Sequence, residues 1–456
     1  MQPKIKLAAI AKNEGAYIPQ WVFHHLNSGF DCLEFWINGT TDNSRKILRK
    51  LSEQYPGQIL IQEADDLLLE CKIKEKNFQI EAYSQIFAET KRAGEFSHVF
   101  FLDLDEFWIS LTPNSSIKDV VAGIPDAESI AFQWYIDIPD YSREAFSSII
   151  RPELLVQKDR HVKSLIKITD KDTKVLIHNS KIFDGNFYLG NGDPLEETHP
   201  EQEHRQKVSN EYFAATKNII DNCFILHLVY KSQTEYLASL MRGRVHVNDN
   251  NVFKVNRFGY NPYTDPDQFY VRFGMERATA YRDAFLCFMQ STDLMTDVQE
   301  AQRFVYAKCN QALDVLAETP SLLTTYHQQL RGLQIDELQN SQIRSTSPLF
   351  HIDVIKLFGS TLIVLGWAWD PLSVNKIELE VDAPEGSVVS ISKAERPDVQ
   401  SVHSDAHLDC GFKIEINLTT AIREKLDLDS LPFKVFAKNP YFRHELTTGK
   451  KIILVE

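Results

Sequence analysis

The sequence has few cysteines, and none of them is placed as in a metal site or a redox motif. The six residues are far apart, and no two form a Cys-x-x-Cys pair. They are Cys32, Cys71, Cys223, Cys287, Cys309 and Cys410. This spacing gives no support to a zinc-finger or thioredoxin-like site and predicts free, mostly buried thiols in a reducing compartment.

An excess of positive charge and long apolar runs are also lacking. The chain has 49 Lys and Arg residues against 63 Asp and Glu residues, which gives a net charge of −14. This charge disfavours nucleic acid as a partner and gives no general attraction to an anionic membrane. No run of about 20 apolar residues occurs, and no signal-peptide pattern opens the chain. We therefore expect a cytoplasmic protein, with any membrane contact peripheral and on the cytoplasmic face of the inner membrane.

The first half of the sequence alternates short apolar runs with helical patterns. Strands are expected at 5–11, 33–37, 59–61 and from 98 onward, and helices at 18–28, 44–55 and 72–92. This order predicts an α/β fold with a mainly parallel sheet and right-handed crossovers. Neither G-x-G-x-x-G nor G-x-x-x-x-G-K-[ST] occurs, so a dinucleotide-binding Rossmann site or a P-loop has no support.

Two carboxylates follow the apolar run that begins at His98. In an extended chain, residues i and i+2 face the same side, so Asp103 and Asp105 are expected to project together. The carboxyl ends of strands are where open α/β sheets bind ligands. Two like charges repel unless a cation lies between them, and oxygen ligands suit Mg²⁺ or Mn²⁺. The alternative is a solvated strand end whose acidic residues cap the next helix.

Further polar residues follow the first two predicted strands, and they are expected at the same edge of the sheet. Asn13 and Glu14 come after the first strand, and Asn38 and Asp42 after the second. Because the carboxyl ends of parallel strands meet at one edge, these side chains can converge with the two aspartates on a single crevice.

Several motifs occur in a fixed order between about residues 4 and 250. They are Ala11-Lys12-Asn13-Glu14 with Trp21 and His25, Asn38-Gly39-Thr40-Thr41-Asp42-Asn43-Ser44, Asp103-Leu104-Asp105-Glu106-Phe107, Lys163-Ser164-Leu165-Ile166-Lys167 and His227-Leu228-Val229-Tyr230-Lys231-Ser232. This order resembles bacterial glycosyltransferase family 2-like proteins, which are related to glycosyltransferase family 92.

The resemblance implies a GT-A fold that binds a nucleotide-sugar donor, most often a UDP-sugar, through Mn²⁺ or Mg²⁺. Asp103, Asp105 and His227 would hold the metal. The residues that would contact the donor are Ala11, Asn13, Glu14, Asn38, Asp42, Asp103, Lys163 and Lys231. Asn38 stands where relatives frequently have an acidic residue, so the resemblance does not define the contact to the base.

Glycosyl transfer also requires a group that accepts the proton of the acceptor hydroxyl. Inverting enzymes use a carboxylate on the face opposite the leaving group. The candidates are Asp137, which is preferred, and Glu106, which stands beside the aspartate pair and could instead be a structural partner for Lys or Arg. Lys163 or Lys231 could add positive charge to stabilise the departing diphosphate.

The rest of the chain divides into two further parts. Apolar residues at helical spacing between about 266 and 333 predict helices, and the polar stretch 340–348 predicts a linker. Beyond it, alternating apolar residues separated by turn residues predict a small antiparallel β-sandwich. The expected domains are therefore 1–260 (catalytic), 261–345 (helical segment and linker) and 346–456 (accessory). Self-association would use the helical or C-terminal segment.

The sequence thus predicts a metal-dependent glycosyltransferase that moves a sugar from a nucleotide donor to a cell-surface glycan such as lipopolysaccharide, capsule or exopolysaccharide. Inversion is expected by family analogy. Two alternatives stay open. One is a non-catalytic glycan-binding protein on a degenerate transferase fold. The other is a sugar nucleotidyltransferase, although the Gly-rich, basic phosphate loop typical of that class is absent from the N-terminal stretch.

Overall fold

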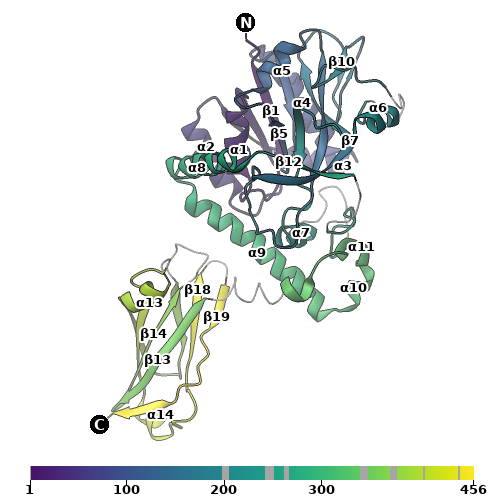
Figure 1. Ribbon diagram of the computed structural model, residues 1–456. Coiled ribbons are helices and arrows are strands. Elements are labelled where there is room, and N and C mark those ends of the chain that lie inside the picture. The colour runs from purple at the N-terminus through teal and green to yellow at the C-terminus, as the bar shows by residue number, and fades with distance from the viewer. Residues whose placement is uncertain are drawn as a thin grey trace. The chain divides into compact units, whose positions relative to one another are not determined.

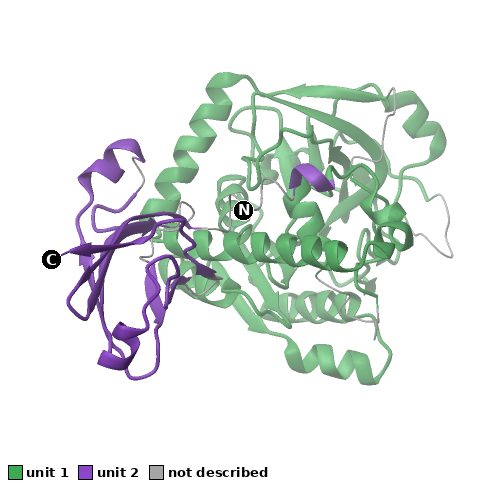
Figure 2. Ribbon diagram, turned by 90° about the horizontal axis from the view of Figure 1, so that it is seen from below, with its two compact units in different colours: residues 1–334 green, residues 335–456 purple. Residues whose placement is uncertain are grey.

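The structure is a computed structural model that describes residues 2–197, 205–241, 251–260, 267–338, 348–369, 377–403, 406–439 and 442–455. The chain forms two compact units, Met1–Gln334 and Ile335–Glu456 (Figure 2). Within the described residues, no helix is both long and apolar enough to cross a membrane.

A ten-stranded sheet forms the centre of the first unit. Its main path has the order β3-β2-β1-β4-β7-β6-β11-β5, with β10 paired to β6 and β12 paired to β7. The strands are β1 (Ile5–Ala11), β2 (Cys32–Ile37), β3 (Ile59–Glu63), β4 (His98–Phe101), β5 (Glu106–Ser110), β6 (Ser129–Asp137), β7 (Glu153–Lys167), β10 (Phe187–Leu189), β11 (Cys223–His227) and β12 (Gln268–Arg272). A separate pair is formed by β8 (Thr173–Lys174) and β9 (Lys181–Ile182). The first four strands along the path are parallel, which confirms the predicted α/β class.

Helices flank this sheet, and α1, α2 and α8 lie together beside its N-terminal strands (Figure 1). The helices of this unit are α1 (Ile18–Asn27), α2 (Ser44–Gln54), α3 (Asp65–Ile73), α4 (Phe78–Ala93), α5 (Ile117–Gly123), α6 (Asn210–Thr216), α7 (Gln233–Leu240), α8 (Met275–Ser291), α9 (Met295–Glu318), α10 (Ser321–Thr325) and α11 (His327–Leu330). Helices α8 to α11 account for the predicted helical segment and belong to the first compact unit. Of the predicted linker, 340–348, residues 340–347 lie outside the described residues.

The single helix predicted at 72–92 is two helices in the structure. Helix α3 ends at Ile73, and α4 begins after Asn77, whose side chain accepts hydrogen bonds from the backbone N–H groups of Gln79 and Ile80. Glu75, between the two helices, has a positive φ of 53°. The left-handed residue Glu75 follows the end of α3, and the capping side chain of Asn77 begins α4. The apolar periodicity does not report either feature, so it did not reveal the break.

Strand β1 separates two apolar clusters, which explains the apolar run Leu7–Ala11 that follows the ion-paired Lys6. Leu7 and Ala9 belong to one cluster together with residues of α1 and α2. Ala8, whose side chain points to the opposite face, belongs to a second cluster with residues of α4. A strand that is buried on both faces favours apolar residues at successive positions.

Burial also keeps two histidines neutral, and this predicts acid sensitivity. Burial lowers the pKa of His24, in α1, and of His98, in β4, to about 4 from an ordinary value of 6.5. The unfolded chain therefore binds more protons between pH 6.5 and 4, and folding stability should fall as the pH drops through this window, by up to about 3 kcal/mol for each histidine. We expect the melting temperature of His24→Gln to depend less on pH between 7 and 4.5 than that of the wild type. An unchanged pH dependence would show that His24 is not buried in its neutral form.

The second unit consists of two sheets around one apolar core. Their strand orders are β16-β17-β14-β13-β20 and β15-β18-β19. The elements are β13 (Leu349–Phe358), β14 (Thr361–Trp369), β15 (Glu378–Asp382), β16 (Val388–Ala394), α13 (Pro397–Val402), β17 (Gly411–Asn417), α14 (Thr420–Glu424), β18 (Lys434–Asn439), β19 (Phe442–Glu445) and β20 (Ile452–Val455). All strand pairs are antiparallel except β13 and β20, so the predicted antiparallel β architecture is confirmed with one parallel exception.

Candidate active site

The two aspartates of the Asp103-Leu104-Asp105 motif do not project together. Strand β4 ends at Phe101, and the chain makes a turn in which the Glu106 N–H donates to the Asp103 carbonyl at 3.0 Å. Because the predicted i, i+2 alignment needs an extended strand, this turn sends the two carboxylates to different partners. The expectation that the two aspartates lie in one extended strand was wrong for this reason.

Asp103 lies in a polar cluster with Gln79, Tyr83 and Lys163, and its side chain is still 40% exposed. Its Oδ1 accepts from Gln79 Nε2 at 3.1 Å, and its Oδ2 lies 3.1 Å from Lys163 Nζ. Tyr83 adds a longer hydroxyl contact at 3.4 Å. Both carboxylate oxygens of Asp103 are therefore engaged by the protein.

Lys163 and Glu106 complete this cluster inside the protein. Both residues have no exposed surface, and Lys163 Nζ lies 3.1 Å from Glu106 Oε2. Burial raises the pKa of Glu106 to about 7, and the nearby ammonium group opposes this rise. Burial alone would lower the pKa of Lys163, but Asp103 and Glu106 outweigh it and raise this pKa above its usual value. Lys163 is thus not exposed to a donor, and Glu106 is the structural partner of a lysine rather than an accessible base.

Asp105 faces His227, the last residue of β11. Asp105 Oδ2 lies 3.8 Å from His227 Nε2. Burial would raise the pKa of Asp105, but His227, Lys231 and Arg257 lower it well below its usual range. Burial likewise would lower the pKa of His227, and Asp105 reverses this and raises it. This pair is the part of the predicted ligand set that the structure brings together.

The side chains suit a divalent ion at Asp105 and His227, whereas Asp103 is already paired with Lys163. A carboxylate oxygen and an imidazole nitrogen are donors that Mn²⁺ accepts, and sites of this type often use one or two protein ligands with substrate phosphates. The second imidazole nitrogen, His227 Nδ1, has no hydrogen-bond partner among the described residues. Within those residues, no group of three or more His, Cys, Asp or Glu side chains is arranged to hold a metal ion, so the predicted three-residue set is not formed.

Asn13 and Asp42 were predicted to contact the nucleotide-sugar donor. In the structure their side chains join the loops after β1 and β2 by hydrogen bonds. Asn13 has a positive φ of 54°, and its Oδ1 accepts from the backbone N–H groups of Thr41 at 2.7 Å and Asp42 at 3.2 Å. In return, Asp42 Oδ2 accepts from the Gly15 N–H at 2.9 Å. The side chains of Asn13 and Asp42 therefore shape the edge of the crevice by holding its two loops together.

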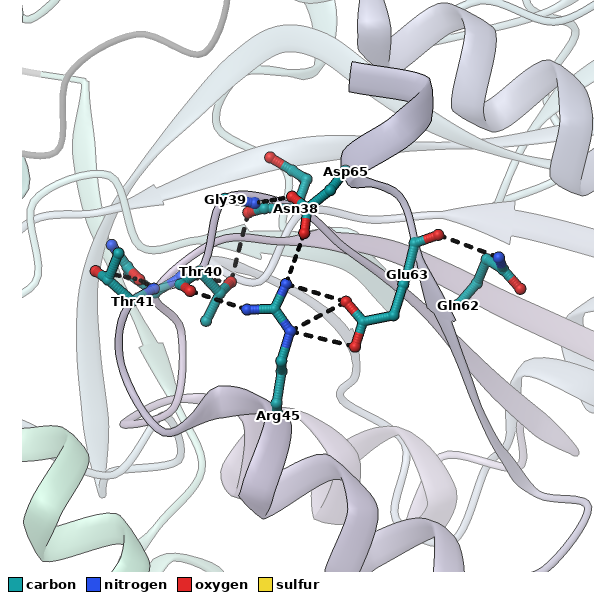
Figure 3. A network of polar contacts seen from close by, with 9 residues as sticks. Asn38, Gly39, Thr40, Thr41, Arg45, Gln62, Glu63 and Asp65 are labelled. Atoms are coloured by element: carbon teal, nitrogen blue, oxygen red, sulfur yellow. Dashed lines mark hydrogen bonds and ion pairs between the residues drawn. The ribbon is translucent and has the colours of Figure 1, made fainter. Parts of the chain in front are cut away.

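Asn38 is a buried amide without a side-chain partner. It is 1% exposed, and neither its Oδ1 nor its Nδ2 has a hydrogen-bond partner in the described part of the chain. Next to it, Arg45 donates to the Thr40 carbonyl and is paired with Glu63 and Asp65 (Figure 3). Arg45 is thus neutralised by Glu63 and Asp65, and none of these three side chains hydrogen-bonds to the Asn38 amide.

Ala11 and Glu14 are less accessible than predicted. The Ala11 side chain is fully buried in the core, and its carbonyl accepts from the Asn38 N–H at 3.1 Å. Glu14 is 8% exposed, and its carbonyl accepts the N–H groups of Tyr17 and Ile18 at the start of α1. Ala11 therefore positions Asn38, and the main chain of Glu14 begins the helix.

A pocket lies beside Asp105, and basic side chains from separate segments line it. Lys231 has a positive φ of 56° and places its Nζ 3.2 Å from the centre of the Tyr17 ring. Arg257 and Lys308, the latter from α9, also line this pocket. Among the described residues, none of the three basic groups has a carboxylate within ion-pair distance. Positive charge is therefore available for an anionic ligand.

Asp137 is not available as a base. It has no exposed surface, and its two oxygens are paired with Arg143 and Arg151. Both oxygens of this carboxylate are occupied by guanidinium groups, so neither is free to face an acceptor hydroxyl. The preference for Asp137 as the general base is corrected by this arrangement.

Sequence reasoning missed Arg257, Lys308 and Tyr17 as pocket residues. Arg257 and Lys308 lie more than 140 residues after the Asp103-Leu104-Asp105 motif, outside every motif that was identified. Tyr17 follows the first motif directly, and an aromatic residue next to a predicted loop was the one available signal. Helix α9 and the segment around Arg257 both pack against α7. This packing brings Lys308 and Arg257 into the pocket that Asp105 lines.

No protein-family model and no curated protein matches the sequence. Among solved structures, S. aureus TarS is similar over 99% of this chain and 78% of that chain, with 11% identity and a TM-score of 0.24. TarS 1–349 in complex with UDP is similar over 79% of this chain and 96% of that chain, with 13% identity and a TM-score of 0.24. Similarities at this level are too weak to assign a function to this chain.

Proposed function

We propose that the protein is a metal-dependent glycosyltransferase that uses a nucleotide-sugar donor, with UDP as the nucleotide, and a cell-surface glycan as acceptor. One observation supports this proposal above the others. The Asp105–His227 pair borders a pocket whose basic side chains, Lys231 and Arg257, have no acidic partner among the described residues. A carboxylate–imidazole pair beside a pocket where basic side chains outnumber acidic ones suits a metal-bound diphosphate.

In this proposal Asp105 and His227 hold Mn²⁺ or Mg²⁺, which when bound neutralises negative charge on the departing diphosphate. Lys231 and Arg257 contact the phosphate oxygens and stabilise the charge that develops as the glycosidic bond to the donor breaks. Asp103 and Lys163 act indirectly, because their cluster fixes the turn from which Asp105 projects. Asn13 and Asp42 hold the two loops that border the same crevice.

The Asn38 amide, which is 1% exposed and has no side-chain partner among the described residues, matches uracil in its hydrogen-bonding groups. An amide offers one acceptor, Oδ1, and one donor group, Nδ2, side by side. The edge of uracil offers the complementary N–H and carbonyl groups, whereas a carboxylate in this position would supply acceptors alone. Asn38 lies at the end of β2, next to the loops that Asn13 and Asp42 hold.

Calorimetry with UDP tests the donor site. We expect UDP to bind more tightly with Mn²⁺ than with EDTA, and Arg257→Gln to weaken binding by about 10- to 100-fold, because a hydrogen bond to a charged group contributes about 1.5–3 kcal/mol. Arg92→Gln is the matched control, since Arg92 is exposed at the end of α4, away from the pocket residues.

Absence of UDP binding, with or without the metal, would contradict the proposal and favour a glycan-binding protein on a transferase-like fold. If Arg257→Gln and Arg92→Gln changed the UDP affinity equally, the proposed contact between Arg257 and the donor would be refuted. Release of pyrophosphate from UTP and a sugar 1-phosphate would instead identify a nucleotidyltransferase.

A further inference from the structure

A second pocket lies directly beside the proposed donor pocket. The two pockets share Tyr17, Leu228, Lys231 and Glu235 in their walls. A ligand in the second pocket would therefore meet the donor at Tyr17 and Lys231. Two adjoining pockets are what a transfer reaction between two substrates requires, because the reacting atoms must be held together.

Aromatic rings form one wall of this second pocket. Phe146 and Tyr17 both line it, with ring centres 6.0 Å apart, and Tyr306 packs edge-on against Phe146 at 5.6 Å. Phe146 has a positive φ of 60°, which is rare and strained for a bulky side chain. Backbone strain of this kind is common at ligand sites, where the fold holds a side chain in a required position.

Asp137 holds the loop that presents Phe146. Its two oxygens are paired with Arg143 and Arg151, which lie on either side of Phe146 in the sequence. The loop is therefore fixed at both ends to the end of β6. This gives Asp137 a positioning role in place of the base role predicted from the sequence.

The charges in the wall of this pocket cancel. Three basic residues line it, and three acidic residues oppose them. The basic residues are Arg143, Arg151 and Lys231, and the acidic residues are Asp137, Glu144 and Glu235. The donor pocket differs, because Asp105 and Glu235 there face three basic side chains, Lys231, Arg257 and Lys308. A charge-balanced wall has no net attraction for a phosphorylated or carboxylated ligand.

We propose that this second pocket is the acceptor site and that it binds an uncharged sugar unit, with Phe146 as the stacking surface. The inference rests on the proposed glycosyltransferase function and adds to it the chemical class of the acceptor. An aromatic wall packs against the apolar face of a sugar ring, and polar groups at the rim accept its hydroxyl groups. Glu144 is exposed at this rim, and among the described residues its carboxylate has no ion-pair partner.

Saturation-transfer NMR with simple glycosides tests the proposal. The neutral probes are the methyl glycosides of glucose, galactose and N-acetylglucosamine, and the charged probes are glucose 6-phosphate and glucuronate, each at up to tens of millimolar. We expect at least one neutral probe to bind and neither charged probe to bind more tightly. Phe146→Ala should weaken binding by about tenfold, since an aromatic contact contributes about 0.5–1.5 kcal/mol beyond the area that it buries.

Two further variants keep the test decisive. Phe183→Ala removes a ring that is 77% exposed and outside the pocket wall, and it should leave binding unchanged. Glu144→Gln changes an exposed side chain, so it should preserve the fold and weaken binding of the neutral probe several-fold. UDP affinity, measured in each variant, should stay at the wild-type value.

The outcomes separate this inference from the proposed function. If wild-type protein binds UDP but no neutral glycoside, or if a charged probe binds more tightly, the acceptor proposal is overturned and the donor proposal stands. Equal binding by the wild type and by Phe146→Ala would also overturn it. If the wild type does not bind UDP, the transferase function itself fails.

Discussion

Replacing Asp105 by asparagine is expected to reduce donor turnover by about a thousandfold. The substitution keeps the size of the side chain but removes the negative charge that faces His227 at 3.8 Å. A metal ion supplies several kcal/mol of charge stabilisation in reactions of this kind, and each 1.36 kcal/mol corresponds to tenfold in rate. Hydrolysis of UDP-sugars in the presence of Mn²⁺ measures the loss, and calorimetry should show that Mn²⁺ no longer strengthens UDP binding.

Asp126→Asn is the matched control for this experiment. Asp126 is an exposed aspartate in the loop before β6, and it lines neither of the two pockets. Turnover by this variant should equal that of the wild type. If Asp105→Asn kept its turnover and its response to Mn²⁺, the proposed metal role of Asp105 would be refuted.

Replacing Lys163 by methionine is expected to destabilise the first unit by about 3–5 kcal/mol, the cost of leaving a buried charge without its partner. Lys163 lies within 3.1 Å of both Asp103 and Glu106, and it is fully buried. Without its ammonium group, the buried carboxylate of Glu106 would be left without a cation next to the partly exposed carboxylate of Asp103. For a unit of this size we expect the melting temperature to fall by roughly 10 °C, measured by calorimetry or circular dichroism.

A second substitution separates lost charge from lost packing. Adding Glu106→Gln to Lys163→Met removes the buried carboxylate that the first substitution left unpaired. The double variant should therefore be more stable than Lys163→Met alone. The exposed Lys72→Met should leave the melting temperature nearly unchanged. If Lys163→Met melted at the wild-type temperature, the buried cluster would have no structural role.

The parts of the site that the sequence predicted are those that depend on local pattern. Asp105 and His227 both stand at the end of an apolar run, and such runs are buried strands whose ends meet at one edge of the sheet. The loops with Asn13 and Asp42 were found in the same way, by polar turn residues after a strand. What the pattern did not contain was the direction of each side chain, because a turn after Phe101 sends Asp103 and Asp105 to different partners.

The sequence by itself determined the α/β class, the order of its first strands and the second, β-rich unit, because apolar periodicity reports which faces of an element are buried. Only the tertiary structure decided that Asp137 is held by two arginines and that Lys163 is enclosed by two carboxylates. It also decided that Arg257 and Lys308 reach the pocket beside Asp105. The physical reason is that charge pairing depends on distance in space, and residues far apart in the chain acquire their partners only when the elements that hold them pack together.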